Sequence, residues 1–166
     1  MLNKKNSIIL IIIFFIILLS IISTFIIEHV LDHQPCNLCL YERIPYFVSA
    51  LLLIYIFLFK KYERITFLIL FLIFALSFLL AFYHFGIEQG FFSESFVCNL
   101  ENQSITLTKE QLLKELNQNI VSCKDVTFRI LGLSLTAINT ILSVVLSIIF
   151  LKLFFNYGSS STSQYK

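Results

Sequence analysis

The run SIILIIIFFIILLSIISTFII, from Ser7 to Ile27, decides the fold class of this chain. It contains no charged residue, and a helix built from it is long enough to cross the roughly 30 Å apolar core of a bilayer. Lys4 and Lys5 precede it, as in a signal peptide, but the run is too long for that and no small-residue cleavage site follows it. We therefore expect a retained transmembrane helix at about residues 7–27.

Three further apolar runs follow the first. The chain is 58% hydrophobic and only 13% charged, with a mean hydropathy of +0.88. A soluble domain of this size has too little polar material to cover so much apolar surface. The expected fold is an all-α membrane protein, a four-transmembrane-helix bundle. It forms one domain over residues 1–166, with spans at about 7–27, 39–59, 65–85 and 130–153 and a cytoplasmic tail at 154–166.

The second span is too short unless it includes charged residues. Counted back from Phe59, its uncharged part reaches only Ile44, which is roughly 24 Å of helix. A full span must take in Arg43 and Glu42 and reach Cys39. An arginine at membrane depth is costly and usually marks a functional site. The structural alternative is that Arg43 pairs with Glu42 or reaches up to the lipid head groups.

The distribution of basic residues predicts the orientation. Lysine and arginine occur at the N-terminus, in the short turn after the second span and in the C-terminal tail. The first loop, Glu28 to Gln34, has none, and the long loop, Gly86 to Arg129, is acidic over most of its length. The positive-inside rule therefore predicts cytoplasmic termini and places all the cysteines on the oxidising, periplasmic side.

The long loop also carries a helix signal. Thr108 and Gln111 match a capping box, and leucines follow at helical spacing, so we expect a short amphipathic helix on the membrane surface or on top of the bundle. The formal net charge is only +2 and the basic residues form no patch, which argues against nucleic acid as a partner.

The four cysteines form two pairs, Cys36 with Cys39 and Cys98 with Cys123. A Cys-x-x-Cys motif serves zinc, c-type haem, iron–sulfur clusters or thiol–disulfide exchange. Leu40 stands where haem attachment needs a histidine, and the second pair is too widely spaced for a zinc ligand pair. Dithiol chemistry without a metal is the favoured interpretation, and a static disulfide is the alternative. The wider pair suits either a redox partner or a staple that stabilises by roughly 3 kcal/mol.

A helix over residues 36–43 would place Cys36, Cys39 and Arg43 on one face. A guanidinium one turn below Cys39 favours its thiolate and can hold an oxygen of a bound electron acceptor. The sequence has no glycine-rich nucleotide motif, and His84 alone cannot supply paired haem ligands. A membrane quinone is therefore the expected acceptor. We assign His84 no role and expect it to be a buried histidine bonded to a helix end.

The stretch QPCNLCLYER, Gln34 to Arg43, resembles the Cys-x-x-Cys-x-Tyr-Glu-Arg signature of the disulfide-bond formation protein B (DsbB) family. The order of spans, loops and cysteines is similar to that family over nearly the whole chain. The resemblance implies a multi-pass thiol:quinone oxidoreductase of the bacterial inner membrane. Such an enzyme reoxidises a periplasmic DsbA-like thiol oxidase and passes the electrons to ubiquinone or menaquinone, and so supports disulfide formation in secreted proteins.

The resemblance also implies roles for individual residues. It pairs Cys98 with Cys123 and Cys36 with Cys39 as disulfides, all four cysteines being catalytic. Cys98 matches the cysteine that forms a mixed disulfide with DsbA. Cys39 matches the cysteine that meets the quinone, and Arg43 matches the arginine that supports quinone binding. The signature does not separate this family from its sister branch, DsbI.

Two other interpretations stay open. One is a non-catalytic four-helix membrane subunit stapled by two structural disulfides, in which both pairs stay oxidised whatever the quinone supply. The other is an enzyme similar to vitamin K epoxide reductase, which also combines four helices with a quinone. Its Cys-x-x-Cys motif lies late in the chain, however, whereas here the motif opens the second span.

Overall fold

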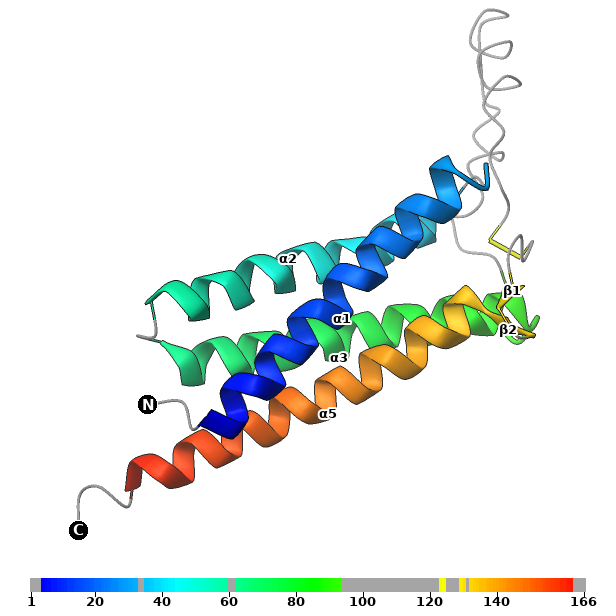
Figure 1. Cartoon of the computed structure of the whole chain (residues 1–166). Coiled ribbons are helices and arrows are strands. Elements are labelled where there is room, and N and C mark those ends of the chain that lie inside the picture. The colour runs from blue at the N-terminus through cyan, green and yellow to red at the C-terminus, as the bar shows by residue number, and fades with distance from the viewer. Residues whose placement is uncertain are drawn as a thin grey trace, which may run out of the picture.

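A computed structural model describes residues 4–32, 35–59, 62–93, 123–124, 129–130 and 132–162. Its long helices are α1 (Lys4–His29), α2 (Asn37–Phe59), α3 (Glu63–Glu88) and α5 (Leu135–Thr162). They form an elongated bundle with both chain termini at the same end (Figure 1). All four are long and apolar enough to cross a membrane. The structure thus confirms the predicted four-span helical architecture.

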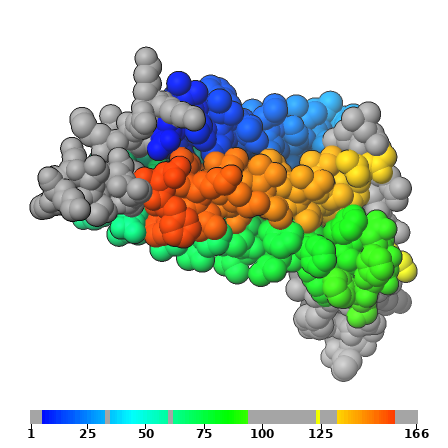
Figure 2. Space-filling view, turned by 90° about the horizontal axis from the view of Figure 1, so that it is seen from below, coloured from blue at the N-terminus to red at the C-terminus, as the bar shows by residue number. Residues whose placement is uncertain are grey.

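Apolar side chains from all four helices form the centre of the bundle. Phe74 of α3 stacks on Phe150 of α5, with ring centroids 5.7 Å apart, and meets the edge of Tyr46 of α2 at 5.7 Å. Helix α3 packs extensively against α5, and α5 lies between α1 and α3 on the face seen in Figure 2. This packing fixes which side of each helix faces inward.

Large apolar side chains also cover the outside of the bundle. One from each helix illustrates this: the exposed fractions are 65% for Leu19, 68% for Leu51, 66% for Leu76 and 59% for Ile141. So much contiguous apolar surface is unfavourable in water but costs nothing in hydrocarbon. The chain is therefore a multi-pass membrane protein.

The end of the bundle opposite the termini gathers the end of α1, the start of α2, the end of α3 and the start of α5 (Figure 1). Helix α1 continues through Glu28, which the sequence placed in the first loop, so this carboxylate belongs to the last turn of a helix. Helix α2 begins at Asn37 and includes Cys39, Glu42 and Arg43, as the short second span required.

The fourth helix begins later than the predicted residue 130, because a small hairpin precedes it. Strands β1 (Arg129–Ile130) and β2 (Leu133–Ser134) pair antiparallel, and Gly132 has the positive φ of 85° that so tight a turn requires. The Ser134 Oγ then accepts the backbone N–H of Ala137 at 3.2 Å, which is an N-cap for α5.

At its other end α5 continues to Thr162, well into the predicted tail at 154–166. Its apolar membrane-crossing part ends at Asn156. The surface helix predicted after Thr108 lies outside the described residues, and so does Cys98.

Candidate functional site

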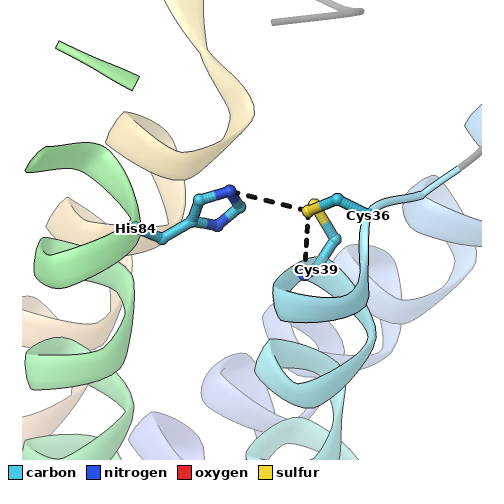
Figure 3. A group of neighbouring side chains, drawn as sticks. All are labelled: Cys36, Cys39 and His84. Atoms are coloured by element: carbon cyan, nitrogen blue, oxygen red, sulfur yellow. Dashed lines mark hydrogen bonds between the residues drawn. The ribbon is translucent and has the colours of Figure 1, made fainter. Parts of the chain in front are cut away.

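Cys36 and Cys39 lie together at the amino end of α2 (Figure 3). Both are free thiols, with the two Sγ atoms 2.8 Å apart, and the backbone N–H of Cys39 donates to the Cys36 Sγ at 3.3 Å. Cys36 is 5% exposed, while Cys39 is partly exposed. A helix amino end favours negative charge on a neighbouring sulfur. The two sulfurs thus lie side by side in a setting that stabilises a thiolate.

His84 reaches the same pair from α3 (Figure 3). Its Nε2 lies 3.6 Å from the Cys36 Sγ, and its Nδ1 lies 2.8 Å from the Glu42 Oε1. An ionised carboxylate can only accept, so Nδ1–H donates to Glu42 and Nε2 faces the sulfur. This imidazole can therefore take a proton from the Cys36 thiol or return one. His84 is buried, as expected, but its partners are side chains of α2 and of the segment before it rather than backbone groups of a helix end.

Glu42 is itself fully bonded inside the bundle. It is 7% exposed, and its second oxygen accepts the Asn139 Nδ2–H of α5 at 2.6 Å. The Asn139 carbonyl in turn accepts the hydroxyl of Tyr46. A buried carboxylate without such partners would be strongly unfavourable. Three helices thus combine to hold Glu42, and through it the orientation of His84.

The surroundings of Cys36, which lies just before α2, change its acidity. A hydrogen bond from the Cys39 thiol is the largest cause that lowers the pKa of Cys36, to about 4. His84 lowers it further by a hydrogen bond and by its charge, while burial acts in the opposite direction. These surroundings therefore favour the thiolate of Cys36, the form that attacks disulfides.

Arg43 lies near the pair but does not bond to it. Its guanidinium donates to the Glu28 carboxylate of α1 at 2.5 Å and sits 5.8 Å from the ring centroid of Phe25. The predicted contact beneath Cys39 is thus replaced, among the described residues, by an ion pair between α1 and α2. That pair is 16% exposed at Arg43 and 26% at Glu28, which places it at the edge of the bundle.

Cys123 joins the site from the long loop. It is 2% exposed and forms one buried cluster with Cys36, Leu38 and Ile87, against which Cys39 also packs. Cys123 is disulfide-bonded, and its predicted partner, Cys98, lies outside the described residues. The structure thus brings three of the four predicted catalytic cysteines together.

His84 and Glu42 make contacts at this site that the sequence alone did not indicate. The sequence alone indicates no role for His84 and suggests Glu42 only as a partner for Arg43. The available signal was general: ionisable residues inside apolar runs usually face the bundle interior and mark functional sites. Cys36, Cys39 and His84 also offer three metal-ligating atoms within 4.8 Å of one another.

Comparisons with known proteins found similar sequences. The family model described as disulfide bond formation protein DsbB matches residues 5–153, most of the chain. A protein of Rickettsia prowazekii (strain Madrid E), described as uncharacterized protein RP370, is 28% identical over 145 residues. That match covers 86% of this chain and 84% of the Rickettsia protein.

Proposed function

Since the chain belongs to the DsbB family of disulfide bond formation proteins, we propose that it reoxidises a DsbA-like periplasmic thiol oxidase and passes the electrons to a membrane quinone. In this proposal it is an inner-membrane enzyme with both termini in the cytoplasm and its cysteines on the periplasmic side. The observation that carries the proposal is the buried cluster in which Cys123 packs with Cys36. Membership of one cluster supports a relay in which Cys123 of the long loop exchanges with Cys36.

The electron relay then runs through successive disulfide exchanges. A thiolate of reduced DsbA attacks Cys98, and the Cys98–Cys123 disulfide opens. The Cys123 thiolate attacks Cys36, and Cys39 leaves as a thiolate. The second DsbA thiolate attacks the DsbA–Cys98 mixed disulfide, which forms the DsbA disulfide and releases the Cys98 thiolate. Cys98 then attacks Cys123, which restores the loop disulfide and releases Cys36. The net result is one new disulfide in DsbA and a reduced Cys36/Cys39 dithiol.

In this scheme His84, held by Glu42, accepts the proton of Cys36 and returns it. When the Cys36–Cys39 disulfide has been reduced, Cys36 carries either a proton or a negative charge. The His84 Nε2 accepts the proton, while Glu42 holds Nδ1–H and stabilises the resulting imidazolium. His84 thereby keeps Cys36 ready to reform the disulfide without moving a bare charge into the bundle.

The residues around Cys39 suit a quinone. A bound quinone supplies a two-electron acceptor that restores the Cys36–Cys39 disulfide. Cys39 is partly exposed, and Arg43 follows it by one helical turn. The guanidinium has five N–H donors, and its described hydrogen bond engages NH1 with Glu28, so others remain for a carbonyl oxygen. Phe25 and Phe47, with ring centroids 6.3 Å apart, add an apolar aromatic wall beside Arg43.

The direct test is quinone reduction by the purified, detergent-solubilised protein with a reduced DsbA-like protein as electron donor. We expect catalytic turnover that depends on both the donor and the quinone. Ubiquinone and menaquinone should be compared in the same assay. If neither quinone supports turnover and both cysteine pairs stay oxidised, the result would support a stapled, non-catalytic subunit instead.

Replacing His84 with Gln should shift the thiol reactivity of Cys36. Because hydrogen bonding and the charge of His84 lower the pKa of Cys36, the wild-type alkylation rate should change little between pH 6 and 8. In His84→Gln the thiolate fraction at low pH falls, and the rate should rise with pH towards its ordinary dependence of about tenfold per unit. Peptide mapping by mass spectrometry reports Cys36 separately from Cys39.

The matched control for this measurement is His29→Gln. His29 is an exposed histidine in the last turn of α1, at the same end of the bundle. Its replacement should leave the profile of Cys36 unchanged. Parallel profiles for wild type and His84→Gln would remove His84 from the proposed mechanism.

Replacing Arg43 with Gln should weaken quinone use more than thiol chemistry. We expect KM for the quinone to rise about tenfold, the loss typical of one charge-assisted hydrogen bond. The alkylation rate of Cys36 should stay close to wild type. Arg64→Gln is the control, because Arg64 lies near the start of α3, at the other end of the bundle, over the ring of Phe154. Equal KM values for the Arg43→Gln protein and wild type would contradict a quinone contact.

A further inference from the structure

We infer that the reduced site is also a binding site for a thiophilic metal ion of the zinc class, held by Cys36, Cys39 and His84. These residues supply two sulfurs and one imidazole nitrogen, all within 4.8 Å of one another. The sequence argued against zinc because no second close ligand pair follows the Cys-x-x-Cys motif. The third ligand instead comes from α3, which the fold brings against the start of α2.

The distances fit such an ion with little rearrangement. Zinc–sulfur bonds of about 2.3 Å and zinc–nitrogen bonds of about 2.0–2.1 Å at a tetrahedral angle place the two ligand atoms roughly 3.6 Å apart. The Cys36 Sγ and the His84 Nε2 are 3.6 Å apart. The two sulfurs, at 2.8 Å, must separate to roughly 3.8 Å. A rotation of the Cys39 side chain, which is partly exposed, would supply this separation.

Glu42 completes a pattern that is typical of metal-binding histidines. Such histidines donate their second ring N–H to a carboxylate, which fixes the tautomer and aims the other nitrogen at the metal. Here the Glu42 Oε1 takes Nδ1–H at 2.8 Å, so Nε2 presents its lone pair towards the sulfurs. Asn139 holds the other carboxylate oxygen at 2.6 Å. Glu42 and Asn139 therefore already hold His84 in the orientation that a metal ligand requires.

Charge also favours the bound state. Two thiolates side by side in a buried setting repel each other, and each carries a desolvation penalty. A divalent cation neutralises both, while the two thiol protons leave to solvent and His84 stays neutral. The three protein ligands leave a fourth position for water, as in zinc sites that are not purely structural.

The site is gated by its own redox state. An oxidised Cys36–Cys39 disulfide offers no thiolate, so only the reduced form binds the ion. Bound metal holds both sulfurs and keeps them from disulfide exchange. The inference rests on ligand geometry and does not depend on the proposed electron relay.

The test is a Co²⁺ titration of the reduced full-length chain in detergent, with Cys98→Ser and Cys123→Ser introduced so that Cys36 and Cys39 are the remaining thiols. We expect one equivalent to bind, with thiolate charge-transfer bands and the strong visible bands of tetrahedral Co²⁺, and Zn²⁺ to displace it. His84→Gln should weaken binding at least about tenfold, and Glu42→Gln about ten- to a hundredfold. His29→Gln should bind as the parent does.

Binding that is unchanged in His84→Gln, or the absence of thiolate bands in the parent, would overturn the inference. X-ray absorption of the Zn²⁺-loaded parent identifies the metal ligands directly, so this test does not depend on whether the His84 variant folds. Two sulfur ligands and one imidazole nitrogen support the site, whereas a shell of oxygen ligands overturns it. Because the readout is spectroscopic, a failed metal site leaves the turnover measurement, and hence the proposed function, untouched.

Discussion

Replacing Cys39 with Ser should reduce quinone reduction to the uncatalysed background, a loss of at least about a thousandfold. A hydroxyl cannot form a disulfide with Cys36, so the two electrons delivered to the pair have no exit. The effect is larger than that of any supporting residue because Cys39 takes part in the bond that forms and breaks. The measurement is the steady-state rate with a reduced DsbA-like donor.

Ser49→Ala is a suitable control for the Cys39 variant. Ser49 lies further along α2, buried, and its Oγ lacks a hydrogen-bond partner among the described residues. Removing that oxygen leaves no broken bond and should leave turnover and thermal stability close to wild type. Full turnover in Cys39→Ser would show that the proposed electron exit is wrong.

Replacing Cys123 with Ser should trap the chain in a mixed disulfide with its periplasmic partner. Without the Cys123 sulfur, Cys98 has no intramolecular partner, and the relay cannot carry electrons from the loop to Cys36. The covalent complex, nearly absent in wild type, should become the main form of the protein in cells. Non-reducing electrophoresis detects it, and mass spectrometry identifies the captured protein.

The partner variant, Cys98→Ser, separates a specific complex from random oxidation. It should form no complex, because the sulfur that meets DsbA is gone. Acid-quenched thiol trapping of wild type adds an independent measurement. If both cysteine pairs stay oxidised when quinone is depleted, and Cys123→Ser captures nothing, the chain is a stapled structural subunit.

Metal binding and the electron relay would use the same three side chains, Cys36, Cys39 and His84, in mutually exclusive ways. In the relay, the His84 Nε2 exchanges a proton with Cys36, whose Sγ lies 3.6 Å away. In the metal-bound state, the same nitrogen and both sulfurs are occupied. Thiophilic ions should therefore compete with turnover only when the dithiol is reduced, and Glu42 supports the histidine in both states.

The sequence by itself determined that this protein is helical and that its helices lie in a lipid bilayer. Uncharged runs such as Ser7 to Ile27 can satisfy their backbone only as helices once they enter hydrocarbon. The short second span required a helix that includes Cys39 and Arg43, and α2 does so. These conclusions depend on residues close together in the chain, and local composition is enough for them.

Only the tertiary structure decided which side chains meet. Glu42 and Arg43 are neighbours, and each residue turns a helix by about 100°. Packing of α2 against α1 and α3 turns Glu42 inward to His84 and leaves Arg43 facing Glu28. No periodicity within a single run shows which side of a lipid-exposed helix faces its neighbours, because lipid and core are equally apolar. The buried partner of the dithiol therefore became visible only when α3 was placed beside α2.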